Sequence, residues 1–202
     1  MAKLYFRFGA MNSGKSTSIL QVAHNYKERG QTAIIAKPTV DTKDEKVLSR
    51  LGIGQQVDIP VEPGTNVLEH FKLSFTAAGN PVDGKTAVDC LIVDEAQFLT
   101  RTQINDLLII AVQENIPVIA YGLRSDFQGK GFEGSLRLME IAHSLEEMKT
   151  ICRCGKKAMF NGRKLNGEYV STGGQIVIDA GGEIEYESLC AKCYLDNVGP
   201  LL

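Results

Sequence analysis

The sequence predicts an α/β protein built on a mostly parallel β-sheet, and three observations support this prediction. Short, continuously apolar runs recur along the N-terminal two thirds of the chain, as in strands that are covered on both faces. Helical patterns separate these runs, and parallel strands need such connections. The first run passes through a glycine-rich turn directly into a helical pattern, which is the order of a βα unit.

Four strands are expected from the apolar runs. The first is rich in aromatic and aliphatic residues and ends at Gly9, and the later runs contain mainly Ile, Val, Leu and Ala. Cys90 lies within the third run, so we interpret it as an inert core residue. The expected strands are residues 3–8, 32–36, 88–93 and 117–121.

Helices are expected between and after these strands. Apolar residues fall at helical spacing over residues 15–29, and Gly30 is placed to end that helix in a left-handed conformation. Thr100 and Gln103 form the pattern of a capping box, which predicts a helix through residue 111. A weaker pattern covers residues 68–75, a further helical pattern covers residues 136–148, and long connections are expected elsewhere in residues 39–85.

Chain length and composition limit the domain organisation and the location. The 202 residues, 44% of them hydrophobic, can bury one substantial core and a small appendage. We expect a core over residues 1–149, a second domain over 150–194 and a tail over 195–202, because the composition shifts to cysteines and glycines after Lys149. The apolar runs are too short to span a bilayer and no signal-peptide pattern begins the chain, so a cytoplasmic location is expected.

The charge distribution argues against a nucleic-acid-binding protein. The formal net charge is −2, the sequence pI is about 6.0, and the 22 basic residues are scattered along the chain. A polyanion partner would require a basic patch.

The strongest motif is a complete phosphate-binding loop, G-x-x-x-x-G-K-S, between the first expected strand and the first expected helix. Its glycines let backbone N–H groups surround phosphate oxygens. Lys15 is expected to contact the β- and γ-phosphates of ATP, and the Ser16 hydroxyl is expected to bind Mg²⁺. The motif and predicted ATP site comprise Gly9, Ala10, Met11, Asn12, Ser13, Gly14, Lys15 and Ser16.

A second motif follows the third strand, where Asp94 and Glu95 stand at its carboxyl end. Asp94 fits the role of a Mg²⁺ ligand, and Glu95 is placed to accept a proton from an attacking hydroxyl. Which of the two acts as the base stays open on this reasoning, and simple capping of the next helix is the alternative.

A third motif is made of Cys152, Cys154, Cys190 and Cys193, in C-x-C and C-x-x-C spacing. In a reducing compartment such a set predicts a closed, tetrahedral and therefore structural Zn²⁺ site rather than disulfides. Unpaired surface cysteines are the alternative. The segment between the pairs is either a loop that folds over a substrate or an ordinary hairpin.

Together these motifs resemble type II thymidine kinases. The resemblance rests on the phosphate-binding loop, on Asp94-Glu95-Ala96-Gln97-Phe98, on residues 121–127 (YGLRSDF) and on the cysteine pairs, in that order over nearly the whole chain. It implies a RecA-like ATP-binding core, a zinc-held lasso that closes over the nucleoside, and a homotetramer. It also implies phosphorylation of thymidine on its 5′-hydroxyl and inhibition by thymidine triphosphate.

The resemblance further implies residue roles. Glu95 matches the general base, and Asp94, Glu95, Ala96 and Gln97 match an ATP-contacting segment. The matching nucleoside-binding positions are Met11, Leu123, Phe127, Phe132, Asn161, Ile176, Ile178, Gly181 and Tyr186. Core packing is the alternative for the apolar members of this set.

The sequence departs from the family pattern at three places. Residues 41–44 (DTKD) lack the usual arginine and aromatic residue, although Arg50 matches. Asn161 stands where some members carry threonine, and Cys193 stands where histidine is frequent. The alternatives to a thymidine kinase are a P-loop kinase of another deoxynucleoside and a nucleic-acid-stimulated ATPase with a zinc ribbon.

Overall fold

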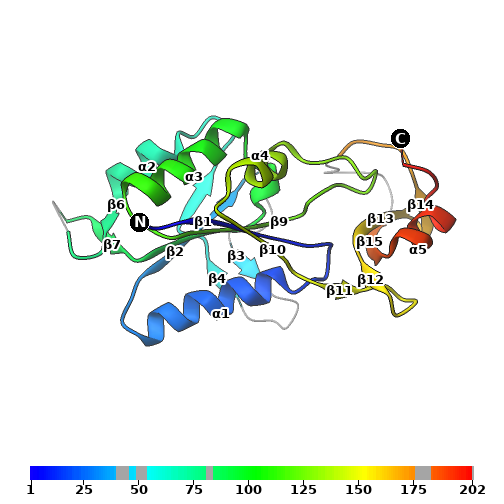
Figure 1. Cartoon of the computed structure of the whole chain (residues 1–202), viewed down its shortest axis with the longest axis horizontal. Helices are drawn as coiled ribbons and strands as arrows, with labels where there is room; N and C mark the ends of the chain where they lie inside the picture. Colours follow the sequence, from blue (N-terminus) through cyan, green and yellow to red (C-terminus); the bar gives the residue numbers. More distant parts are fainter. Residues whose placement is uncertain (40–45, 49–53, 81–83, 176–182, 202) are drawn as a thin grey trace.

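A six-stranded parallel sheet forms the centre of the molecule in the computed structural model, which describes residues 1–39, 46–48, 54–80, 84–175 and 183–201 (Figure 1). The strand order is β10-β1-β9-β8-β2-β5, and every neighbouring pair runs parallel. The predicted α/β class is therefore confirmed. The strands are β1 (Leu4–Phe8), β2 (Ala33–Pro38), β5 (Ile59–Val61), β8 (Cys90–Val93), β9 (Val118–Gly122) and β10 (Ser144–Glu147).

Helices cover both faces of this sheet. In Figure 1, α1 (Lys15–Glu28) lies below the sheet, whereas α2 (Val67–Ser74), α3 (Arg101–Gln113) and α4 (Glu133–Ile141) lie above it. Alternate residues of β2 divide between the two layers: Ile35 packs in the cluster that contains Ile19 of α1, and Ile34 packs in the cluster that contains Ile104 of α3. Burial on both faces explains the continuously apolar strands.

Local signals set the ends of two helices as expected. Gly30 follows α1 with φ of +70°, the conformation that glycine adopts at low cost. Thr100 and Gln103 make both hydrogen bonds of a capping box at the start of α3. Cys90 is fully buried in β8, as expected of a core residue.

The helix expected over residues 136–148 is wrong in its second half. Helix α4 ends at Ile141, and residues 144–147 form the edge strand β10, which pairs with β1. The first three side chains of β10 are exposed, so no apolar alternation marks it as a strand. Its conformation comes from hydrogen bonds to β1 and from an ion pair of 2.8 Å between Arg7 and Glu146.

The stretch expected to hold long connections contains more regular structure than predicted. Besides α2 and β5, its described part forms three short strands, and a fourth lies just beyond it. The strands β3 (Lys46–Leu48) and β4 (Gly54–Gln56) form an antiparallel pair, and β6 (Phe75–Ala77) pairs with β7 (Thr86–Val88) in parallel. Residues 41–44, which differ from the family pattern, and Arg50 lie outside the described residues.

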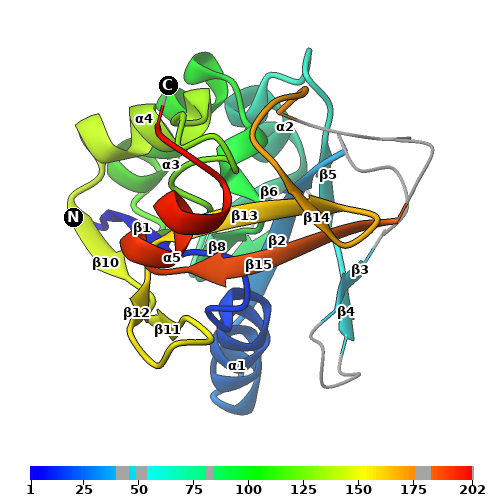
Figure 2. The same cartoon turned by 90° about the vertical axis from the view of Figure 1, so that its right-hand side faces the viewer.

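The four cysteines predicted to bind a metal lie beyond the carboxyl end of the central strands, on the right of Figure 1. We call the described residues of 150–197 the cysteine-rich unit. Its three-stranded antiparallel sheet crosses in front of the core in Figure 2. The unit contains β11 (Thr150–Ile151), β12 (Lys157–Ala158), β13 (Phe160–Leu165), β14 (Glu168–Val170), β15 (Ile184–Leu189) and α5 (Ala191–Asn197).

Among the helices of the described residues, none combines the length and the apolar character that a membrane crossing needs.

Candidate active site

The phosphate-binding loop connects β1 to α1 and leaves the N-terminus of α1 open. Gly9 has no room for a side chain, because a Cβ atom there would lie 2.5 Å from the Met148 carbonyl oxygen and from Ser13 Oγ. Gly14 precedes the helix with φ of +78°, and no side chain caps the helix there. Free N–H groups and the helix dipole make this end a site for an anion.

Lys15 lies at the centre of this loop with only 9% of its surface exposed. Its Nζ donates hydrogen bonds of 2.9 Å to the Ala10 carbonyl and 3.3 Å to Ser13 Oγ. Burial lowers the pKa of Lys15, and the charges of Glu95 and Asp94 oppose that shift. The Lys15 ammonium therefore interacts electrostatically with both carboxyl groups.

Asp94 directly follows β8 and is 4% exposed. Burial raises its pKa to about 7, the negative charge of Glu95 adds to the shift, and the Glu95 N–H with the charges of Lys37 and Lys15 opposes it. Its Oδ1 accepts the Glu95 N–H at 2.9 Å. A buried carboxyl in this position is suited to a divalent cation, which would favour its charged form.

Glu95 adopts an unusual backbone conformation directly after β8. Its φ of +49° and ψ of +37° place it in the left-handed region, and its side chain makes no capping bond to the short 3₁₀ helix η1 (Ala96–Phe98) that follows. Left-handed residues other than glycine are strained and concentrate at functional sites. The Glu95 side chain therefore does not cap this helix, and its carboxylate is left for another role.

Gln97 fixes the direction of the Glu95 side chain. Its Nε2 donates to Glu95 Oε2, and its Oε1 accepts the Leu123 N–H at 3.0 Å. Gln97 is 2% exposed, and Ala96 beside it is fully buried. A Cβ atom on Gly122 would lie 2.7 Å from Gln97 Oε1, so this glycine allows the close approach. Gln97, which was expected to contact ATP, thus holds the Glu95 carboxylate and the segment that begins at Leu123 in place.

The apolar residues predicted to surround a nucleoside base are buried near the end of β9. Leu123, Phe127 and Phe132 are each at most 6% exposed. Phe132 packs edge-to-face on Phe98 of η1, with ring centroids 5.5 Å apart. The predicted positions Ile176, Ile178 and Gly181 lie outside the described residues.

Arg163 connects the described lasso residues to Phe127. Its guanidinium lies 3.7 Å from the centroid of the Phe127 ring, and its Nε donates to Tyr186 Oη at 3.0 Å. The two remaining guanidinium nitrogens donate to the carbonyls of Gly174 and Gln175. Arg163 thereby links Tyr186 to Phe127.

Asn161 uses both ends of its amide within the protein. Oδ1 accepts the Met11 N–H at 2.7 Å, and Nδ2 donates to the Ser125 carbonyl at 3.1 Å. Met11 belongs to the phosphate-binding loop and Ser125 to the segment that contains Leu123 and Phe127. Asn161 thus joins the two sides of the candidate site.

The four predicted metal ligands converge in the cysteine-rich unit. Their sulfur atoms all lie within 4.8 Å of one another. Although burial opposes it, hydrogen bonds from the backbone of Cys154 and Cys190 lower the pKa of Cys152 to about 7. Hydrogen bonds with the three other thiols raise the pKa of Cys193 to about 12. Four thiolates would repel one another, so this donor set fits a soft cation such as Zn²⁺ that neutralises them.

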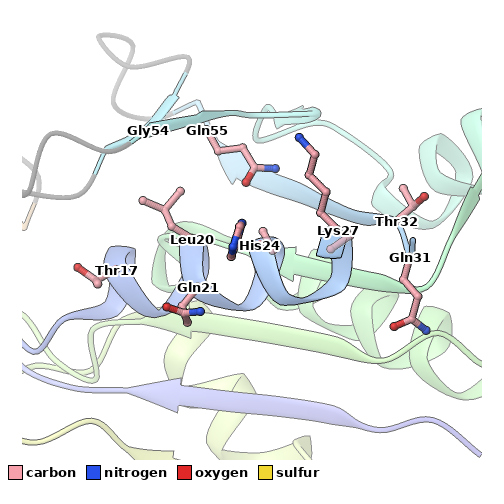
Figure 3. A pocket seen from close by; sticks show the side chains of 11 residues that line it. Thr17, Leu20, Gln21, His24, Lys27, Gln31, Thr32, Gly54 and Gln55 are labelled. Carbon is pink, nitrogen blue, oxygen red and sulfur yellow. The ribbon is translucent and has the colours of Figure 1, made fainter. Parts of the chain in front are cut away.

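A separate groove lies along the outer side of α1 (Figure 3). It encloses about 720 Å³ between α1, the segment that enters β2 and strand β4. Thr17, Leu20, His24 and Lys27 line it from the helix, and Gln55 lines it from β4. None of the predicted site residues is among those that line it, so it is distinct from the phosphate-binding loop.

The structural roles of Arg163, Gln97 and Ser188, whose Oγ donates to the Met11 carbonyl, were not predicted from the sequence. Arg163 and Ser188 stand in strands without a motif, and only the positions of their neighbours in space give them partners. The pair Asn166-Gly167 is a sequence pattern typical of a hairpin turn. It forms the turn between β13 and β14, with positive φ at both residues. This turn shows that 160–170 forms a hairpin.

Comparison with known proteins agrees with this arrangement. The family model described as thymidine kinase matches residues 2–194. The chain is 45% identical over 195 residues to the thymidine kinase of Enterobacteria phage T4, with 95% of each chain covered. It is 42% identical over 202 residues to that of Idiomarina loihiensis, covering 98% of this chain and 99% of the relative. It is also 42% identical to that of Coxiella burnetii.

Proposed function

The chain belongs to the thymidine kinase family, and from this premise we propose how its residues phosphorylate thymidine. The γ-phosphoryl group of ATP passes to the 5′-hydroxyl of the nucleoside. A bond forms between the 5′-oxygen and the γ-phosphorus, the bond from that phosphorus to the β,γ-bridging oxygen breaks, and ADP leaves. The products are thymidine monophosphate and ADP.

The ATP phosphates bind at residues 9–16, where the open N-terminus of α1 and the buried Lys15 supply positive charge. On binding, Lys15 exchanges its bonds to Ala10 and Ser13 for the β- and γ-phosphates. Ser16 and Asp94 would hold Mg²⁺, which supplies neutralisation of the phosphate charge when bound. The raised pKa of Asp94 fits a carboxyl group that awaits a cation.

Glu95 accepts the proton from the 5′-hydroxyl. The bond from Gln97 and the left-handed backbone orient its carboxylate. The single observation that carries this role is its place at the carboxyl end of the parallel sheet, the same end at which the phosphate-binding loop leaves β1. The base therefore stands beside the phosphate site, so that it can align the hydroxyl for attack.

The thymine ring is proposed to lie among Met11, Leu123, Phe127, Phe132 and Tyr186, with the remaining lasso positions closing over it. Three of these residues are buried and apolar, which suits the ring and its methyl group. One methyl group in such a pocket is worth about 1–3 kcal/mol, so deoxyuridine should be a weaker substrate rather than an excluded one.

Zn²⁺ is proposed to bind the four cysteines as a structural ion, since all four ligand positions are filled by protein. As the resemblance implies, we further propose a homotetramer and inhibition by thymidine triphosphate. Light scattering on the purified protein tests the first, and thymidine phosphorylation with added thymidine triphosphate tests the second.

A substrate panel tests the assigned nucleoside. Purified protein with ATP and Mg²⁺ is offered thymidine, deoxyuridine, deoxycytidine and deoxyguanosine, and the phosphorylated products are measured. Thymidine should give the highest kcat/KM, followed by deoxyuridine. Deoxycytidine should be poor because its exchanged donor and acceptor would leave backbone groups unpaired. Preference for another nucleoside would overturn the assignment.

A further inference from the structure

Two side chains of the cysteine-rich unit form hydrogen bonds with the N–H and the carbonyl of Met11 in the phosphate-binding loop. Asn161 of β13 and Ser188 of β15 are direct cross-strand partners, so their side chains share one face of the sheet. Asn161 Oδ1 accepts the Met11 N–H at 2.7 Å, and Ser188 Oγ donates to the Met11 carbonyl. Asn161 is 3% and Ser188 is 5% exposed.

A third bond of the same kind involves the next loop residue. Thr150 Oγ1 donates to the Asn12 carbonyl at 3.1 Å. Each peptide unit is planar and trans, so the direction of one carbonyl fixes the direction of the N–H group that follows it. Ser188 therefore sets the direction of the Asn12 N–H, and Thr150 sets that of the Ser13 N–H.

The bond from Asn161 acts on the preceding peptide unit. The Met11 N–H lies in one plane with the Ala10 carbonyl, which accepts the Lys15 ammonium at 2.9 Å. Three successive peptide units of the loop are thus oriented by the cysteine-rich unit. The bonds also hold Asn12 at φ of +60°, a left-handed value that residues with a side chain seldom adopt.

The same sheet face reaches the nucleoside side of the site. Arg163 and Tyr186 are the next cross-strand pair on that face, and Arg163 stacks on Phe127. Asn161 also donates to the Ser125 carbonyl. Movement of this face would therefore affect both the phosphate-binding loop and the pocket around Phe127.

We propose that Asn161 and Ser188 are positioning residues for the phosphate-binding loop, through which the cysteine-rich unit couples ATP binding to nucleoside binding. The proposal rests on the proposed function for the identity of the two ligands. Ordering of the unit by one substrate aligns the loop N–H groups for the other, and such a coupling acts equally in both directions.

The test uses Ser188→Ala in the full-length, zinc-loaded protein. Titration with a non-hydrolysable ATP analogue and Mg²⁺, with and without thymidine, gives the analogue Kd. Removal of the hydroxyl leaves the Met11 carbonyl unpaired, so the analogue Kd and the ATP KM should rise about five- to thirty-fold. The Kd of thymidine alone should stay within about threefold, and the gain in analogue affinity on adding thymidine should shrink.

Two variants make the test specific. Ser188→Thr keeps the hydroxyl and should restore ATP affinity. Ser171→Ala removes an exposed hydroxyl from the same unit and should leave every constant unchanged. An analogue Kd within twofold of wild type in Ser188→Ala would overturn the proposal, as would equal weakening of thymidine and the analogue. Failure of wild type to phosphorylate thymidine would instead count against the proposed function.

Discussion

Glu95 combines a reactive group with a backbone that is costly to maintain. Its left-handed conformation and its bond from Gln97 hold the carboxylate in one direction at the tip of β8. Gln97 in turn is fixed by the Leu123 N–H. The position of one carboxylate therefore depends on two segments of the chain.

Glu95→Gln should lower kcat for thymidine phosphorylation by roughly 10²–10⁴-fold, because the amide cannot accept the hydroxyl proton. The Kd of a non-hydrolysable ATP analogue should change little, since Lys15 and the loop remain intact. Steady-state kinetics and calorimetry measure the two quantities. Unchanged turnover would remove Glu95 from the role of base.

The raised pKa of Asp94 should make the free energy of unfolding depend on pH. Its pKa is raised from 3.8 to about 7 in the folded protein, so the folded state holds this proton more tightly than the unfolded state. Its contribution to the free energy of unfolding therefore falls as the pH rises from about 4 to about 7.

Asp94→Asn should consequently be more stable than wild type at about pH 8 without nucleotide or Mg²⁺, and the difference should shrink toward about pH 4. Urea denaturation at several pH values measures it. Asp196→Asn changes an exposed carboxyl and serves as the control. An identical stability difference at every pH would contradict the assignment of the raised pKa.

At the scale of single elements, caps and strand pairing decide where helices begin and end. The capping box of Thr100 and Gln103 starts α3, and Gln103 Nε2 also donates to the Glu62 carbonyl at 2.8 Å. The start of α3 is therefore tied to the segment that precedes α2. The helix then packs Ile104 and Leu107 against the sheet.

Thr100→Ala should destabilise the protein by about 1 kcal/mol, because one N–H group at the helix start loses its partner. For a chain of this length that corresponds to a Tm lower by about 2–4 °C. Thr102→Ala, in the exposed part of the same helix, is the matched control and should leave Tm nearly unchanged. Equal Tm values for the two variants would contradict a role for the cap.

At the scale of the whole molecule, the cysteine-rich unit touches both sides of the active site. It contacts the phosphate-binding loop through Asn161, Ser188 and Thr150, and it contacts Phe127 through Arg163. A further bond of 2.7 Å joins Tyr194 Oη to the Phe127 carbonyl. Loss of the folded conformation of this unit should therefore lower activity, although the cysteines themselves lie outside the active site.

Cys154→Ser should reduce bound zinc and loosen the unit, which should raise KM for thymidine. Elemental analysis and kinetics on the same preparation measure both effects. Cys90→Ala is the matched control, because this cysteine is buried in β8 away from the cluster and its loss should leave the zinc content unchanged. Full zinc content in Cys154→Ser would show that the Cys154 thiol is not required for zinc binding.

The sequence by itself determined the features that depend on neighbouring residues. The apolar runs predicted the central strands, the threonine and glutamine predicted a cap, and the glycines and lysine predicted the loop between β1 and α1. These patterns are readable because helix caps and strand burial leave their marks within a few residues. Four cysteines in two short motifs likewise predicted their cluster.

Only the tertiary structure decided the conformation of residues 144–147 and the partners of Met11. The edge strand β10 has exposed side chains and a helix-like sequence, and pairing with β1 overrides that preference. The bonds from Met11 to Asn161 and Ser188 join residues 150 and 177 positions apart. Such contacts arise when the cysteine-rich unit packs against the phosphate-binding loop, and no pattern within a short stretch of sequence encodes them.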